Sequence, residues 1–319
     1  MSHVVPVTTT ITGDMTVLTR VWIAHLSDLH LPITGRLQIR EIRLKRILGL
    51  LSWLTRRRHI HHLRWLSCVI RDALSTHPDM LAVTGDLTNL GAMVEFRNAR
   101  QWLDEQNLPP TLIVPGNHEI LVREHYAQKQ ALWAPWLHPA NLYPRLSCLS
   151  AGNVILIGLN TARPSLPFLA TGAIGKAQLD QLADCLRETG SKGLCRVVLL
   201  HHPPTRCLVV WRKRLEDLQA LEEVLQREGA ELVLHGHSHR ATVSHIAGTD
   251  IPVISSSSAS HAPGHEDSAA GWNHIGIEQA PAGWNITVQR RFLAPSGTMC
   301  DSPLLQHYFL SRPVPLSSA

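Results

Sequence analysis

The sequence lacks several features that would assign it to a common protein class. None of its six cysteines belongs to a Cys-x-x-Cys pair, which argues against a zinc ribbon or a disulfide framework and is typical of a reducing compartment. No run of about 18 apolar residues is present, so no membrane span is predicted. Residues 1–20 contain no apolar segment of the signal-peptide type. We therefore expect a cytoplasmic protein.

Charged residues are also scarce, at 17% of the 319 residues, and no low-complexity tract occurs, which argues against extensive disorder. The hydrophobic content of 44% is sufficient for a substantial core. The formal net charge of +5 has a local origin, because ten Lys or Arg residues lie between Arg36 and Arg71 beside a single acid, Glu41.

Apolar runs of strand length alternate with helical patterns along most of the chain, which is typical of an α/β fold. The last third is richer in strand patterns and predicts a second sheet packed on the first. We expect a flexible lead-in over residues 1–17, a single domain over 18–294, and a Pro/Ser-rich surface tail over 295–319.

Five of the apolar runs end in polar residues that can bind a metal ion. These endings are Asp28-Leu-His30, Gly85-Asp86, Gly116-Asn117-His118-Glu119, His201-His202 and Gly236-His237-Ser238-His239. Because the carboxyl ends of strands in an open α/β sheet gather at one edge, all five can meet there. Imidazoles and carboxylates without thiolates suit Mn, Fe or Zn. The potential ligands are too numerous for one tetrahedral ion and favour a pair of metals.

A pair of divalent metals at this edge would suit a phosphoester. Such a pair stabilises both the attacking and the leaving oxygen of a phosphoryl displacement. Two divalent ions, the carboxylates of Asp28 and Asp86, and a bridging hydroxide leave a charge of about +1, which attracts an anionic substrate. The alternative is that these side chains are caps, turn residues and core groups, which is hard to reconcile with five ordered strand endings.

The order of the five endings resembles the calcineurin-like metallophosphoesterase superfamily over about residues 19–292. The resemblance implies a four-layer α-β-β-α sandwich of two mixed sheets flanked by helices. It also implies two metal ions, each Mn, Fe or Zn. One would be held by Asp28, His30, Asp86 and His239, and the other by Asp86, Asn117, His201 and His237.

The same resemblance assigns roles around the metals. His118 would face the scissile phosphate and either stabilise charge or protonate the leaving group, while a metal-activated hydroxide attacks phosphorus in line. We expect Glu119 and His202 to orient the ligands without binding metal themselves.

Residues 33–62 look like an insertion directly after the first strand ending. Five apolar side chains recur there at the spacing of an amphipathic helix: Leu44, Ile47, Leu48, Leu51 and Leu54. The segment also carries Trp53 and the run Arg56, Arg57 and Arg58, which we regard as candidate substrate or membrane contacts. Its sequence position places it near the metal edge.

Three interpretations of this basic segment are open. The helix can cover the core with a solvated basic face. It can instead hold a lipid substrate or an anionic membrane surface through residues 36–71, as a peripheral protein of the inner face. That would make the protein similar to the UDP-diacylglucosamine pyrophosphohydrolases of lipid A synthesis. Finally, the arginines can follow a nucleic-acid backbone in a DNA or RNA nuclease, although the rest of the chain offers no second basic stripe.

The motifs also resemble bacterial cyclic-nucleotide and glycerophosphodiester phosphodiesterases, which need no such insertion. A non-catalytic scaffold is disfavoured because every ligand position is filled. The sequence therefore predicts a metal-dependent hydrolase of a phosphodiester or a pyrophosphate, with the lipid-linked and the soluble substrate as alternatives.

Overall fold

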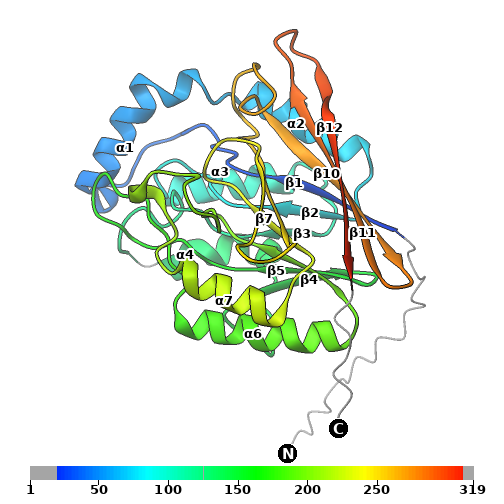
Figure 1. Cartoon of the computed structure of the whole chain (residues 1–319). Helices are drawn as coiled ribbons and strands as arrows, with labels where there is room; N and C mark the ends of the chain where they lie inside the picture. The colour runs from blue at the N-terminus through cyan, green and yellow to red at the C-terminus, as the bar shows by residue number, and fades with distance from the viewer. Residues whose placement is uncertain (1–19, 125, 312–319) are drawn as a thin grey trace, which may run out of the picture.

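The computed structural model describes residues 20–124 and 126–311, which form two facing six-stranded sheets between layers of helices (Figure 1). The strand order is β12-β11-β10-β1-β2-β3 in the first sheet and β4-β5-β6-β7-β9-β8 in the second. Each sheet contains both parallel and antiparallel pairs. The predicted α/β fold with two mixed sheets is therefore confirmed.

The first sheet combines an early parallel part with a late antiparallel part. Its parallel strands are β1 (Arg20–Leu26), β2 (Met80–Val83) and β3 (Thr111–Ile113), and its antiparallel strands are β10 (Gly271–Ala280), β11 (Gly283–Leu293) and β12 (Met299–Ser311). The second sheet contains β4 (Ser147–Ala151), β5 (Val154–Gly158), β6 (Cys195–Leu199), β7 (Leu232–His235), β8 (Val243–His245) and β9 (Pro252–Ser255).

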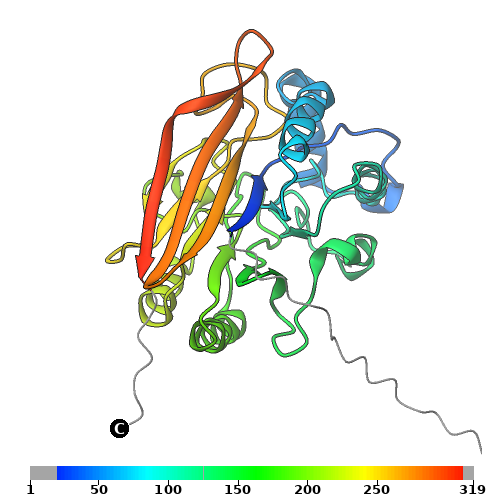
Figure 2. The same ribbon diagram turned by 90° about the vertical axis from the view of Figure 1, so that its right-hand side faces the viewer.

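Helices cover the outer face of each sheet and complete the four layers (Figure 2). Helices α2 (Leu63–Ser75) and α3 (Met93–Asp104) pack on the first sheet, and α6 (Lys176–Ser191) and α7 (Leu218–Glu228) pack on the second. Two short helices, α4 (Tyr126–Gln130) and α5 (Ala134–Leu137), lie beside α3 and β3. A third apolar cluster, which includes Ile23, Ala82 and Val197, fills the space between the sheets. Burial on both faces explains why the central strands are continuous apolar runs.

The carboxyl ends of the parallel strands lie at one edge of the sandwich. Strand β1 runs parallel to β2 and β2 to β3, while β5, β6, β7 and β9 are parallel to one another. A parallel bridge between Ser27 and Ser258, just beyond β1 and β9, joins the two sheets at this edge. The loops that follow these strands therefore meet, which positions the functional site.

The tail predicted over residues 295–319 is wrong for residues 299–311, which form the edge strand β12. This strand pairs with β11 from Gly283↔Ser311 to Leu293↔Met299, with a register irregularity between Gln289 and Arg291. Pro303, which suggested a tail, is tolerated because it lies within this irregular part of an edge strand. Residues 312–319 and the predicted lead-in over 1–17 lie outside the described residues.

The insertion contains η1 (Ile39–Glu41), helix α1 (Leu44–Thr55) and η2 (Arg57–His59), so the predicted helix is present. Its apolar face does not cover the core: Leu44 is 65% exposed and Leu51 is 52% exposed, whereas Arg46 is buried. The interpretation of α1 as a core-covering helix is therefore wrong. Within the described residues, no helix has the length and apolar character needed to cross a membrane.

Candidate metal centre

All seven side chains that the sequence suggests as metal ligands converge at the carboxyl edge of the two sheets. Each lies in a loop directly after a strand, and all but His239, which is half-buried, are buried. The residues are Asp28 and His30 after β1, Asp86 after β2, Asn117 after β3, His201 after β6, and His237 and His239 after β7. Two sequence-distant halves of the chain thus form one cluster.

One group of ligand atoms gathers around Asp28. Its Oδ1 lies 3.1 Å from Nε2 of His239 and 4.0 Å from Nε2 of His30. The two imidazole nitrogens are themselves 3.3 Å apart. Ligand atoms of Asp28, His30 and Asp86 all lie within 4.8 Å of one another, which is close enough for a shared ion.

A second group gathers around His201. Its Nε2 lies 3.3 Å from Oδ2 of Asp86, 3.2 Å from Oδ1 of Asn117 and 3.2 Å from Nδ1 of His237. Asp86, His201 and His237 form a potential metal-binding group by the same distance criterion. Because Asp86 belongs to both groups, its carboxylate lies where it could bridge two ions.

The backbone is strained at these positions. Five of the seven residues have left-handed φ angles: Asp28 (52°), His30 (42°), Asp86 (57°), His237 (66°) and His239 (55°). Residues other than glycine rarely adopt this conformation, which costs about 1–3 kcal/mol each and is concentrated at functional sites. At Gly116, a Cβ atom would lie 2.2 Å from Oδ1 of Asp86, so only glycine permits this approach.

Hydrogen bonds to backbone carbonyls fix the tautomers of the imidazoles. Nδ1 of His30 donates to the carbonyl of Thr88 (3.2 Å), and Nδ1 of His201 donates to that of Thr84 (2.7 Å). In His237 it is Nε2 that donates, to the carbonyl of Lys213 (3.1 Å). Each ring therefore directs its other nitrogen into the cluster, where it is available to a metal ion, as in histidine ligands of metals.

The electrostatics of the cluster fit a cation. Burial opposes charge on Asp86, yet His201 and His118 hold the pKa of this carboxyl well below its usual range. Burial also opposes protonation of His201, but Asp86 and Asp28 outweigh it and raise the pKa of His201 to about 9. Within the described residues, buried Oδ1 of Asp28 makes no hydrogen bond. Convergent lone pairs and a carboxylate oxygen without a donor fit bound metal ions.

Glu119 and His202 lie where an orienting role is expected. The carboxylate of Glu119 accepts the backbone N–H groups of Asp86 (2.9 Å), Thr88 (2.9 Å) and Gly116 (2.7 Å), so it ties the loops after β2 and β3 together. The buried ring of His202 packs against that of His237 at 4.6 Å, and its Nδ1 lies 2.7 Å from the hydroxyl of Thr161.

Four residues of the insertion are candidate substrate or membrane contacts, and of these four only Arg57 reaches the cluster. Its Nη1 donates to Nε2 of His118 at 2.8 Å, while Nδ1 of His118 donates to the carbonyl of Asn89 at 2.5 Å. Burial, reinforced by Arg57, lowers the pKa of His118 to about 3. Arg56 and Arg58 are exposed, and Trp53 is half-buried on α1.

The sequence interpretation missed one imidazole of the insertion. His61 is buried, and its ring lies 4.6 Å from that of His30 and 5.5 Å from that of His239. The run His59-Ile-His-His62, close to the arginines, was the available signal. Sequence position alone did not show which of these histidines turns inward.

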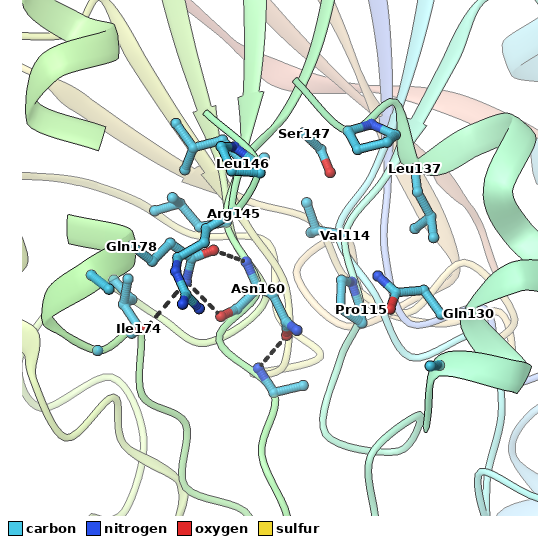
Figure 3. A pocket seen from close by; sticks show the side chains of 18 of the residues that line it. Val114, Pro115, Gln130, Leu137, Arg145, Leu146, Ser147, Asn160, Ile174 and Gln178 are labelled. Carbon is cyan, nitrogen blue, oxygen red and sulfur yellow. Dashed lines mark hydrogen bonds between the residues drawn. The ribbon is translucent and has the colours of Figure 1, made fainter. Parts of the chain in front are cut away.

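A separate pocket of about 780 Å³ opens beside β3 and β5 (Figure 3). Val114 and Pro115 line one side, and Asn160 and Gln178, which are hydrogen-bonded to each other, line the other. None of the seven candidate ligands lines this pocket. This pocket is therefore distinct from the His/Asp cluster.

A sequence model of the calcineurin-like phosphoesterase family matches residues 21–241, which include all five strand endings. The chain belongs to the calcineurin-like phosphoesterase family. It is accordingly a metallophosphoesterase, and the family resemblance of the motifs is confirmed. The His and Asp groups described above are the residues of this chain that fit the family's dinuclear metal centre.

Curated relatives of this metallophosphoesterase carry a more specific name. A Rhodococcus erythropolis protein named "Probable cyclic nucleotide phosphodiesterase" is 26% identical over 240 residues, covering 74% of this chain and 70% of that protein. A Vesicomyosocius okutanii protein of the same name is 28% identical over 166 residues, covering 51% of this chain and 63% of that protein.

Solved structures agree on the fold of the family. A dimetal phosphatase from Danio rerio superposes with a TM-score of 0.56 at 14% identity, covering 88% of this chain and 98% of that one. A purple acid phosphatase from yellow lupin seeds gives a TM-score of 0.55 at 13% identity, covering 92% and 54%. At these identities the similarity shows the fold, and the predicted four-layer sandwich is confirmed.

Proposed function

We propose that this metallophosphoesterase hydrolyses a phosphodiester or a pyrophosphate at a centre of two Mn, Fe or Zn ions. The observation that carries the proposal is the position of Asp86, whose carboxylate belongs to both ligand groups. When bound, the metals would supply Lewis-acid stabilisation and a nucleophilic oxygen at neutral pH. One ion would be held by Asp28, His30, Asp86 and His239, and the other by Asp86, Asn117, His201 and His237.

The protein's own contribution to charge stabilisation is the pair formed by His118 and Arg57. With Nδ1 of His118 donating to the carbonyl of Asn89, its Nε2 is an acceptor and receives the guanidinium of Arg57. In this arrangement Nε2 carries no proton for a leaving group. Of the two roles expected for His118, the contacts favour charge stabilisation, with His118 holding Arg57 beside the phosphate.

Replacing the bridging carboxylate tests the proposal. Asp86→Asn should abolish Mn-dependent hydrolysis of an aryl phosphodiester and reduce bound metal below two ions per chain, because the amide cannot neutralise two cations. Asp104→Asn is the matched control, since Asp104 is exposed on α3 and, among residues 20–124 and 126–311, pairs only with Arg100. Activity of Asp86→Asn comparable to that of the control would contradict the two-metal proposal.

A surface beside the centre supports a lipid-linked substrate. Exposed apolar side chains of three segments form a surface that we call the apolar rim. They are Leu44, Ile47 and Leu51 of α1, Leu166 and Phe168 of the loop between β5 and α6, and Val210 and Trp211 at the start of η4 (Trp211–Lys213). Hydrogen bonds join the segments, because Lys45 Nζ donates to the carbonyls of Ser165 and Leu169, and Ala170 N donates to that of Arg212.

The apolar rim is joined to the metal centre through the η4 segment and is bordered by cations. The carbonyl of Lys213 accepts Nε2 of His237, so the η4 segment contacts a candidate ligand directly. Arg43, Arg56 and Arg212 are exposed on the same segments. Apolar groups bordered by arginine are typical of surfaces that hold acyl chains and anionic headgroups. We therefore favour a lipid-linked phosphoester, such as a nucleoside-diphosphate lipid, and association with an anionic membrane face.

The second candidate is a soluble cyclic nucleotide. It is supported by the names of the curated relatives, which match at 26–28% identity. A hydrolysis screen with Mn over cyclic nucleotides, glycerophosphodiesters, UDP-linked lipids and single-stranded DNA separates the candidates. A kcat/KM that is highest for a cyclic nucleotide would favour this alternative and contradict the lipid-linked substrate.

Vesicle binding provides a test of the apolar rim that is independent of turnover. Leu44→Gln, Ile47→Gln and Leu51→Gln combined should abolish cosedimentation with phosphatidylglycerol vesicles, because they remove the apolar contact and leave the arginines in place. A matched control replaces exposed Leu304, Leu305 and Phe309 of β12 by Gln. Absence of binding by the unmodified protein, or equal loss in both variants, would contradict a lipid-docking rim.

A further inference from the structure

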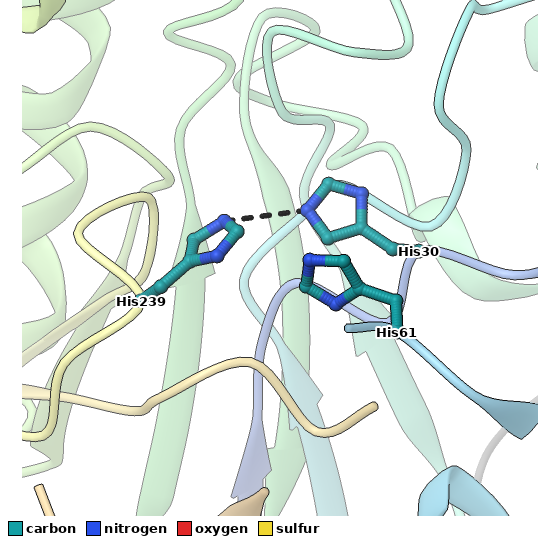
Figure 4. A group of neighbouring side chains, drawn as sticks. All are labelled: His30, His61 and His239. Carbon is teal, nitrogen blue, oxygen red and sulfur yellow. Dashed lines mark hydrogen bonds between the residues drawn. The ribbon is translucent and has the colours of Figure 1, made fainter. Parts of the chain in front are cut away.

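His61 lies at the metal centre although the family's expected ligand set does not include it. Potential ligand atoms of His30, His61 and His239 all lie within 4.8 Å of one another. Figure 4 shows the ring of His61 with one nitrogen turned toward the space between the other two rings. His61 follows η2, so the insertion that carries the basic run also brings this imidazole to the centre.

The hydrogen bonds around His61 determine which ring nitrogen is free. Ser258 Oγ donates its only proton to the carbonyl of Asp28 at 2.6 Å. The same Oγ lies 3.2 Å from Nδ1 of His61, so at this contact the serine accepts and Nδ1 donates. Ser260 Oγ is also 3.0 Å from Nδ1. A neutral ring that donates from Nδ1 has its lone pair on Nε2.

Nothing in the described part of the chain is hydrogen-bonded to Nε2 of His61, although the side chain is largely buried. Its neighbours His30 and His239 are candidate ligands whose Nε2 atoms lie 3.3 Å apart. Nε2 of His30 and Nε2 of His239 can share only one proton, and Nε2 of His61 loses hydration and gains no hydrogen bond in return. A cation that accepts all three lone pairs removes this cost.

We propose that His61 is a fifth protein ligand of the metal that Asp28, His30, Asp86 and His239 hold. The proposal rests on the two-metal centre of the proposed function and adds a residue of the insertion to it. Ser258 is its positioning residue, because it joins the backbone of Asp28 to the ring of His61. The insertion is then part of the metal centre as well as of the substrate surface.

An additional imidazole makes the two metal sites unequal. One ion would have five protein ligands and the other four: Asp86, Asn117, His201 and His237. The five-ligand site should bind more tightly and fill first, and it should prefer Mn, Fe or Zn over Mg, because imidazole suits those ions. Two-step binding is thus the expected behaviour of the unmodified protein.

Metal titration of His61→Ala tests the assignment without relying on activity. Binding of Mn to the metal-free protein is followed by calorimetry, and the absorption of the Co-loaded protein reports the coordination of the metal. We expect the tight step to weaken at least about tenfold, the size of effect that even a change beside the ligands produces. The Co spectrum should change with it. His62→Ala, at the neighbouring half-buried histidine whose Nε2 donates to the carbonyl of His59, should titrate like the unmodified protein.

The outcomes separate this inference from the proposed function. If the unmodified protein binds two ions and Asp86→Asn does not, while His61→Ala keeps both affinities and the Co spectrum, the fifth ligand is excluded and the two-metal centre stands. A change in KM at unaltered metal affinity would make His61 a substrate contact and also overturns the assignment. His61→Gln, with unfolding of the metal-free protein as a check, covers the case in which the alanine variant does not fold.

Discussion

At the scale of single residues, the centre consists of two sets with different origins. The seven ligand candidates follow strands, and each lies in a loop whose backbone the neighbouring strands fix. Arg57 and His61 come from the insertion, and they contact His118 and His30 of the centre, respectively. The first set would bind the metal ions, and the second would adapt the centre to one kind of substrate.

Arg57→Ala should lower kcat about 100-fold, which is the usual cost of removing one group that stabilises transition-state charge. Arg57 is the arginine of its run that donates to His118. Burial lowers its pKa, but Asp86 and Asp28 oppose this, so its positive charge is retained at the proposed phosphate position. Steady-state kinetics on an aryl phosphodiester, with metal content measured in parallel, provide the check.

Arg58→Ala is the control for this prediction, because Arg58 is exposed and donates to His59. It should stay within about twofold of the unmodified protein on this water-soluble substrate. Equal kcat values for the two alanine variants would show that Arg57 makes no contribution to turnover.

The convergence of the seven candidate ligands could be predicted from the sequence, because they follow apolar runs whose strands end at the same edge. An apolar run that ends in Asp-x-His needs only the neighbouring parallel strands to bring its ligands into the cluster. His61 could not be predicted in this way. Its position depends on contacts with Ser258 and Ser260, almost 200 residues later in the chain, and no local period encodes such contacts.

At the scale of elements, α1 shows how a correct helix assignment can accompany a wrong assignment of its faces. The spacing of Leu44, Ile47 and Leu51 predicts the helix, but the side that packs against the protein is the one that carries Arg46. Arg46 donates to the carbonyls of Leu90 (2.9 Å) and Gly91 (2.8 Å) and pairs with Glu124. These acceptors lie in loops outside α1, so the sequence of the helix alone does not show which of its faces is buried.

Arg46→Ala should lower the free energy of unfolding by about 3 kcal/mol, at the low end of the range for breaking a buried ion pair, because Glu124 is partly exposed. The change removes the guanidinium that donates to the carbonyls of Glu41, Leu90 and Gly91 and to Glu124, and among the described residues only Gly91 and Glu124 keep a second donor, Lys129. Denaturant unfolding of the metal-free protein measures the effect, and limited proteolysis within residues 33–62 reports whether α1 detaches.

Arg43→Ala serves as the control, since Arg43 is exposed and its guanidinium donates only to the adjacent carbonyl of Ile42 within the described residues. The denaturant concentration at which half of the Arg43→Ala variant is unfolded should equal that of the unmodified protein. If the two variants unfold at the same denaturant concentration, Arg46 does not anchor the helix.

At the scale of the whole molecule, the metal centre lies at the edge where the two sheets meet. Asp28, Asp86 and Asn117 follow strands of the first sheet, while His201 and His237 follow strands of the second. The bridge between Ser27 and Ser258 and the bond from His237 N to Asp28 Oδ2 (3.0 Å) cross the same junction. Bound metal would therefore link the two halves of the sandwich.

Removing metal should accordingly destabilise the entire domain and not only the loops. A ligand that binds the folded state alone stabilises it by about 2.7 kcal/mol at 100 times its dissociation constant. In a chain of this size that corresponds to a rise of roughly 4 °C in Tm for each site. Calorimetric scans with Mn and with a chelator should differ in Tm by at least this amount, and each should show one cooperative transition.

Asp86→Asn should lose most of this difference in Tm, because it weakens both ligand groups, whereas Asp104→Asn should keep it. A Tm that is the same with Mn and with chelator would show that the cluster does not bind metal in the folded protein.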